Sequence, residues 1–134
     1  MASIFTKIIN GEIPSYKIAE NEEFYAFLDI SPVEKGHALV IPKKEVDYIF
    51  DLEDELLGRL NIFAKKVAKA IEAVVPCERI GIAVVGLEVP HTHIHLIPLH
   101  GIGSLNFGKE RVQLSKEEFV ELAEAIHVEF GGKG

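Results

Sequence analysis

Residues 91–98 read HTHIHLIP, so histidines occupy every second position just before a purely apolar stretch. Alternate residues of a β-strand project from the same face, roughly 6.6 Å apart, and the spacing therefore predicts a strand with three imidazoles in a row on one side. The intervening Ile94 and the following Leu96 then point to the opposite face, toward a hydrophobic core. A strand with one polar and one apolar face belongs in a sheet that is covered on its apolar side.

Short apolar runs bounded by turn-forming residues predict further strands. They lie at residues 16–19, 23–29, 37–41 and 80–85, and the strand with the histidines extends from Thr92 or His93 to Pro98. The run at 37–41 is almost continuously apolar, which favours a central position in the sheet. The Val and Ile content of 80–85 and its flanking glycines favour a buried position for that strand too. Residues 4–9 have the spacing of a short helical turn.

The strongest helix pattern covers about residues 52–75. Its apolar residues recur at three- and four-residue steps and form one stripe, as in a helix that packs against a sheet. The stripe consists of Leu56, Leu60, Phe63, Val67, Ile71 and Val74. A second helix is predicted at about 116–129, because Ser115 and Glu118 have the spacing of a capping box. Residues 131–134 are predicted to form a frayed tail.

These elements predict an α+β fold with an antiparallel sheet of about five strands, one long helix over a face and a C-terminal helix. The length of 134 residues corresponds to a single domain, 1–134, in which residues 101–134 form a C-terminal extension. The net charge of −7 argues against a nucleic acid polymer as partner. The single cysteine excludes an internal disulfide, and no apolar run approaches the ~18 residues of a membrane span. We expect a cytoplasmic protein.

The histidine row allows three interpretations. The histidines can be structural, as hydrogen-bonded residues of the surface or the core. Neighbouring imidazoles can also bind a metal ion, but a Cys-rich zinc site is ruled out and no acidic residue accompanies the row at a typical ligand spacing. The third interpretation is nucleophilic attack on phosphorus, because a neutral imidazole offers one free ring nitrogen while the other keeps its proton.

Four blocks of the sequence, taken in order, resemble the histidine triad (HIT) family, and in particular its Hint branch. They are residues 4–14, 27–32, 36–43 and 91–97. In this family histidines alternate with hydrophobic residues, as they do in the last block. The resemblance covers most of residues 4–98 and implies a HIT-like fold, a homodimer, and nucleotidyl hydrolysis or transfer.

By this resemblance, His93 is the nucleophile that attacks the α-phosphorus and forms a nucleotidyl-histidine intermediate. His91 and His95 flank it, and we expect His95 to face the phosphate and His91 to help orient the nucleophile. His37 matches a histidine that the family places beside this cluster. These four residues are the expected catalytic residues, and the resemblance implies neither an obligatory metal nor a cofactor.

The resemblance also implies a purine nucleotide site. Asp29 matches a residue that accepts hydrogen bonds from the ribose hydroxyls, a task that suits a carboxylate. From the pattern alone, an Asx turn leading into Ser31 and Pro32 is the simpler explanation of Asp29. The expected apolar walls of the nucleotide site, which periodicity alone assigns to the core, consist of Ile4, Phe5, Ile8, Phe27, Leu28, Ile30, Leu39 and Val89.

The loop before the triad departs from the family pattern. It is shorter than in Hint-like chains and has Leu87 where a glutamine is usual, so polar groups expected near the phosphate or the leaving group are missing. Glu88 lies near a phosphate-facing position, where it would either repel an anion or act as an acid. Thr6 stands where some members carry a cysteine of a zinc site, and Glu45 stands where a histidine is frequent.

We therefore predict an enzyme, a nucleotide hydrolase or transferase that acts at the α-phosphate of a purine nucleotide. A purine nucleoside phosphoramidase is the preferred form of this prediction. A dinucleoside polyphosphate hydrolase, or a non-catalytic nucleotide-binding or interaction module, are the alternatives. In each case the ligand is a small-molecule nucleotide.

Overall fold

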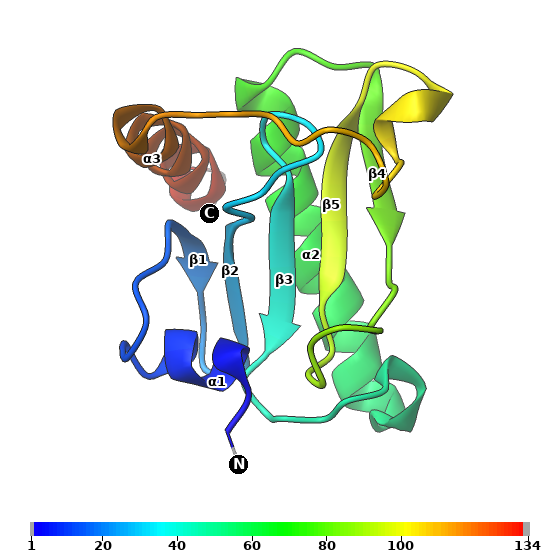
Figure 1. The fold of residues 1–134 in the computed structure, drawn as a ribbon. Helices are drawn as coiled ribbons and strands as arrows, with labels where there is room; N and C mark the ends of the chain where they lie inside the picture. Colours follow the sequence, from blue (N-terminus) through cyan, green and yellow to red (C-terminus); the bar gives the residue numbers. More distant parts are fainter. Residues whose placement is uncertain (1, 133–134) are drawn as a thin grey trace.

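The computed structural model describes residues 2–132 and shows a five-stranded antiparallel sheet with helices on both faces (Figure 1). The strands are β1 (Lys17–Glu20), β2 (Phe24–Leu28), β3 (Ala38–Pro42), β4 (Arg79–Ala83) and β5 (Ile94–Leu99). The helices are α1 (Ile4–Ile9), α2 (Asp54–Val74) and α3 (Lys116–Gly132), with short 3-10 turns η1 (Ile49–Asp51) and η2 (Ile102–Ser104). The strand order is β1-β2-β3-β5-β4, which confirms the predicted α+β fold class.

Alternation along the central strands separates the core from the side of the sheet that carries the polar side chains. Val40 of β3 pairs with Ile94 of β5, and both point into the core beneath α2, where neither is exposed. The next pair, Leu39 and His95, therefore faces the opposite side of the sheet. The stripe predicted for α2 supplies Leu60, Phe63, Val67 and Ile71 as buried core residues, whereas Leu56 and Val74 are half-buried.

The capping box predicted for the C-terminal helix is formed. The backbone N–H of Glu118 donates to Ser115 Oγ at 3.1 Å, and the backbone N–H of Ser115 donates to Glu118 Oε1 at 2.8 Å. α3 packs against β1 and α2 with the buried residues Phe119, Leu122, Ala123 and Ile126. The helix continues through Gly132, past the predicted end at 129, and residues 133–134 of the predicted tail lie outside the described residues.

Two expectations about the strands are wrong. β4 lies at an edge of the sheet, where it pairs only with β5, and Ile82 is 55% exposed although a buried strand was expected. β5 begins at Ile94, so His91 and His93 precede it. The cause is the backbone of Thr92, whose N–H donates at 2.7 Å to the carbonyl of Val46 instead of joining the sheet. The histidine row thus spans an irregular segment and the first residues of a strand.

The C-terminal extension crosses one end of the sheet and is bonded to the loop between β2 and β3. After η2 the chain crosses the end of the sheet in front of β3 and β2 before it reaches α3 (Figure 1). Its Val112 N–H donates to the carbonyl of Pro32 at 2.9 Å, which ties this crossing to the loop between β2 and β3. Within residues 2–132, none of the helices has the length and apolar character needed to cross a bilayer.

Candidate active site

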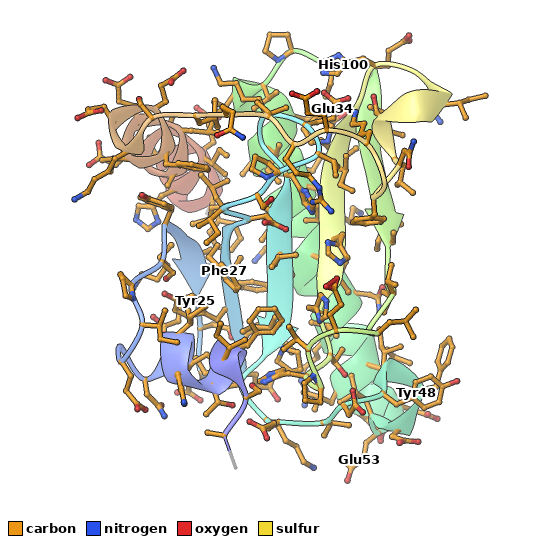
Figure 2. All side chains as sticks on the ribbon, in the orientation of Figure 1. Tyr25, Phe27, Glu34, Tyr48, Glu53 and His100 are labelled. Carbon is orange, nitrogen blue, oxygen red and sulfur yellow. The ribbon has the colours of Figure 1, made fainter. Side chains whose placement is uncertain are left out.

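A cavity of about 700 Å³ opens on the side of the sheet away from α2. α1, β2 and β3, the loop after β4 and the C-terminal crossing enclose it. Its floor is a cluster of buried apolar residues that includes Phe5 of α1, Phe27 of β2 and Leu39 of β3. Figure 2 shows Tyr25 and Phe27 of this cluster on β2, near α1. The apolar wall meets polar groups at one end, which is the arrangement of a small-molecule site.

His93 lines the cavity and has a fixed tautomer. Its Nδ1 lies 2.7 Å from the backbone carbonyl of His91. A carbonyl oxygen only accepts, so Nδ1 carries the proton and Nε2 keeps its lone pair. The ring of Phe5 packs on the imidazole in a T-shaped contact, with centroids 5.0 Å apart, and restricts its rotation. His93 can therefore act as a nucleophile through Nε2.

His95 also lines the cavity, and its tautomer is fixed from behind by His37. The backbone N–H of Val33 donates to His37 Nδ1 at 3.1 Å, so the proton of His37 lies on Nε2. That proton is donated to His95 Nδ1 at 3.0 Å, which leaves the remaining proton of His95 on Nε2. His95 is thus a hydrogen-bond donor beside a nucleophile, while the buried His37 orients it and does not line the cavity.

Burial keeps both of these imidazoles neutral. It lowers the pKa of His37 to about 3, with the nearby His95 and Arg111 acting in the same direction. It lowers the pKa of His95 to about 4, aided by His93 and Arg111. At neutral pH each ring therefore has one donor and one acceptor nitrogen, as the hydrogen bonds from Val33 through His37 to His95 require.

His91 has a different environment from the other two histidines of the row. It is fully buried and is not among the residues that line the cavity. Its Nε2 donates to the carbonyl of Pro42 at 2.7 Å, and its Nδ1 accepts from the hydroxyl of Ser3 at 2.7 Å. His91 therefore stays on the side of the sheet that α1 covers, with its ring centroid 5.8 Å from that of Phe5, but it is buried outside the cavity.

Asp29 forms the expected Asx turn and also lines the cavity. Its Oδ1 accepts from the backbone N–H of Ser31 at 2.8 Å, which is the Asx turn, and its side chain also lines the cavity. Oδ2 lies 3.5 Å from Nε2 of His37. Burial raises the pKa of Asp29, opposed by the Ser31 N–H and the charges of Arg111 and His93. The carboxylate keeps acceptor capacity toward the cavity.

All eight predicted wall residues line this cavity: Ile4, Phe5, Ile8, Phe27, Leu28, Ile30, Leu39 and Val89. Leu28 is also part of the core beneath α2, whereas Ile30, 73% exposed, lies at the rim. The exposed Glu88 and Leu87 of the shortened loop border the opening.

Sequence reasoning missed Phe107 and Arg111, which the C-terminal crossing brings to the polar end of the cavity. The ring of Phe107 packs on His95 with centroids 4.7 Å apart. Arg111 donates to the carbonyls of Ser31 at 2.7 Å and of Phe107 at 2.9 Å. Among the described residues no carboxylate lies within ion-pair distance of Arg111, so its charge is available to an anion. No local pattern marks either residue, because the long crossing alone places them.

The cluster of Asp29, His37 and His95 has the spacing of a metal site, since one ligand atom from each lies within 4.8 Å of the others. The hydrogen bonds argue against this use. A neutral imidazole binds a metal through a nitrogen without a proton, but the Val33 N–H forces the proton of His37 onto Nε2, the nitrogen that faces the other two residues. These residues fit a chain of hydrogen bonds with a fixed direction better than they fit a metal ion.

Comparisons with known proteins find relatives that match most of this chain. The HIT domain family matches residues 10–102. Adenosine 5'-monophosphoramidase hnt1 of Schizosaccharomyces pombe is 39% identical over 132 residues, which cover 94% of this chain and 96% of that protein. An uncharacterized HIT-like protein of Borreliella burgdorferi is 37% identical over 131 residues, 92% of this chain and 94% of that protein. The crystal structure of a Hit-like protein from Bartonella henselae superposes with a TM-score of 0.81 at 32% identity and covers 95% of both chains.

The buried neutral imidazole of His37 predicts a loss of stability on acidification. Its pKa of about 3 in the folded protein lies below the ordinary value of 6.5, so below pH 6.5 the unfolded chain binds more protons. Stability is complete above pH 6.5 and falls as the pH drops toward 3. Between pH 7 and 5, the titration of His37 should lower the free energy of unfolding, measured with urea, by about 2 kcal/mol.

The matched variant is His37→Gln, whose amide oxygen accepts from Val33 and whose amide nitrogen donates to His95 without titrating. Between pH 7 and 5, we expect the free energy of unfolding of this variant to fall by about 2 kcal/mol less than that of the wild type. An equal loss in both proteins would contradict a neutral His37, and because Asp29 is present in both, its own titration cancels.

Proposed function

Because this chain belongs to the histidine triad (HIT) family and is a HIT-type nucleotide hydrolase, we propose that it cleaves purine nucleoside phosphoramidates through a covalent nucleotidyl-His93 intermediate. One observation carries the proposal. The bond from His93 Nδ1 to the His91 carbonyl leaves a lone pair on Nε2 in the wall of the cavity. A neutral imidazole oriented in this way needs no separate base to attack phosphorus.

The proposed reaction has two steps at one phosphorus atom. Nε2 of His93 forms a bond to the α-phosphorus while the bond from phosphorus to the leaving amine breaks, and the amine departs with a proton taken from water at the open side. The Nε2–H of His95 donates to a phosphoryl oxygen as negative charge develops on it. Water then attacks the phosphorus, the bond to His93 breaks, and a nucleoside monophosphate leaves.

The rest of the cavity suits the nucleoside. The carboxylate of Asp29 accepts from the two ribose hydroxyls, which form a pair of adjacent donors. The apolar residues of α1, β2 and β3 pack against the faces of a purine. Adenine and an amine leaving group are favoured because the S. pombe relative is an adenosine 5'-monophosphoramidase.

A dinucleoside polyphosphate hydrolase is the second candidate, and the available charge of Arg111 favours it. A guanidinium at the polar end of the cavity would bind the further phosphates of such a substrate. The two candidates differ in their products, since only the second releases a nucleotide as leaving group.

We predict that brief incubation with adenosine phosphoramidate adds one adenylyl group to the protein, at His93. Intact-protein mass spectrometry after acid-free quenching would detect the adduct, and peptide mapping would locate it. His93→Ala removes Nε2 and should show no adduct and a loss of turnover of at least about a thousandfold, as expected for a covalent catalyst.

A histidine outside the site provides the control for this test. His127→Ala, which changes a histidine on α3, should form the adduct at the wild-type rate. Turnover by His93→Ala at an undiminished rate would disprove covalent catalysis. Nucleotide affinity without turnover in any variant, the wild type included, would favour the non-catalytic module.

We also propose that residues 1–134 form one HIT domain, that the protein is cytoplasmic, and that it is a homodimer joined along β4. The outer side of this edge strand offers unpaired backbone groups, and Ile82 on the strand and Val84 and Val85 just after it are exposed. Pairing two copies there would cover these side chains and extend the sheet across both chains.

Light scattering should therefore give twice the chain mass of 14.8 kDa. Ile82→Lys places a charge in the proposed interface and should shift the protein toward the monomer. Val120→Lys on α3 is a control at another exposed apolar residue and should leave the mass unchanged. A monomeric wild type, or equal behaviour of both variants, would refute the β4 dimer.

A further inference from the structure

A polar cluster outside the cavity connects the N-terminal segment to the triad. The hydroxyl of Ser3 donates to His91 Nδ1 at 2.7 Å and accepts from the backbone N–H of Thr6 at 3.0 Å. The carboxylate of Glu45 accepts from the Ser3 backbone N–H at 2.7 Å and from the Thr6 hydroxyl at 2.6 Å. Ser3 and His91 are both buried, so water does not replace the bond between them, whereas Glu45 is exposed. The mechanism described above uses none of Ser3, Thr6 or Glu45.

The direction of each bond follows from its partners. His91 Nε2 must donate because the carbonyl of Pro42 only accepts, so Nδ1 of a neutral His91 must accept. Ser3 is then the donor to His91, and its lone pairs receive the Thr6 N–H. Glu45 supplies the acceptor that satisfies the remaining donors of Ser3 and Thr6. The shortest contacts thus assign the Ser3 hydroxyl to His91 at 2.7 Å and the Thr6 hydroxyl to Glu45 at 2.6 Å, whereas the contacts of Thr6 Oγ1 with Ser3 Oγ and His91 Nδ1 are longer, at 3.3 and 3.5 Å.

We propose that Ser3, Thr6 and Glu45 are positioning residues for the nucleophile, acting through His91. Ser3 donates to Nδ1 of His91 and so keeps the ring proton on Nε2, and Thr6 and Glu45 hold Ser3 in place. Together they fix the peptide group whose carbonyl accepts from His93 Nδ1. The catalytic consequence rests on the proposed function, whereas the hydrogen-bond arrangement does not.

The route from this cluster to His93 is short. The His91 ring is bonded at both nitrogens, one to Ser3 and the other to Pro42, so residue 91 cannot turn without breaking a buried hydrogen bond. The adjacent Thr92 is bonded through its N–H and its hydroxyl to the carbonyl of Val46, the neighbour of Glu45. The carbonyls of Pro42 and Val46 thus hold residues 91 and 92, which directly precede His93. The carbonyl of the fixed His91 lies 2.7 Å from His93 Nδ1.

Ser3 offers a substitution that separates positioning from helix capping. Ser3 is the N-cap of α1, and aspartate caps helices as well as serine does. An aspartate carboxylate, however, cannot donate to His91 Nδ1 and would accept from it instead. Because Nε2 still donates to Pro42, His91 would then become a cation next to His93. Threonine keeps both the cap and the donor.

The experiment compares Ser3→Asp, Ser3→Ala and Ser3→Thr with the wild type. Two readouts are taken: the single-turnover rate of nucleotidyl-His93 formation, and the charge of His91 from its ring ¹⁵N shifts at neutral pH. We expect Ser3→Asp and Ser3→Ala to form the adduct about tenfold more slowly, the loss of one oriented hydrogen bond, with substrate affinity unchanged. Ser3→Thr should restore the rate, and in Ser3→Asp alone His91 should become doubly protonated.

Two further variants complete the design. Thr6→Val removes the hydroxyl between Ser3 and Glu45 and should slow the adduct by a smaller factor, because Ser3 still contacts His91. Ser115→Asp makes the same substitution at the cap of α3 and should react like the wild type.

Wild-type rates in Ser3→Asp and Ser3→Ala, with His91 neutral in both, would overturn the proposal. If no protein forms an adduct but Ser3→Asp still converts His91 to the cation, the proposed function fails while the assignment of the cluster stands.

Discussion

The carbonyl of His91 lies 2.7 Å from Nδ1 of His93, and this one hydrogen bond decides which nitrogen of the nucleophile is free. With the proton on Nδ1, the lone pair is on Nε2. With the proton on Nε2, the ring would present a donor to phosphorus and no nucleophile. A backbone carbonyl can only accept a hydrogen bond, so it fixes the tautomer of the neutral ring. The other histidines of the site follow the same rule, since the Val33 N–H orders His37 and, through it, His95, and the Pro42 carbonyl orders His91.

The fold places these backbone groups by burying the opposite side of the same strands. Ile94 and Leu96 of β5 are in the core beneath α2, so His95, between them, must face the cavity. The residues before β5 are held differently, by the loop that follows β3 and by the N-terminal segment. The nucleophile thus lies at the junction of a strand and an irregular segment, where backbone carbonyls are not used by the sheet and can bind side chains.

The parts of this architecture that depend on neighbours in sequence were predictable. Period-two alternation placed Ile94 and Leu96 in the core, three- and four-residue steps found α2, and the spacing of Ser115 and Glu118 found the cap of α3. The burial of His91 outside the cavity was not predictable, because it depends on Ser3 and Pro42, 88 and 49 positions away. The same holds for Arg111, whose role depends on a crossing with no periodic pattern. The edge position of β4 was missed because its Val and Ile content does not distinguish an edge strand from a central one.

The central claim is that backbone groups set the protonation of four histidines, and ring ¹⁵N spectroscopy of the unmodified protein at neutral pH tests it most directly. Long-range proton–nitrogen correlations distinguish the two neutral tautomers and the cation for each ring. We expect His93 to carry its proton on Nδ1, and His37, His91 and His95 to carry theirs on Nε2. A His93 that carries its proton on Nε2, or a charged His37 or His95, would contradict the central claim.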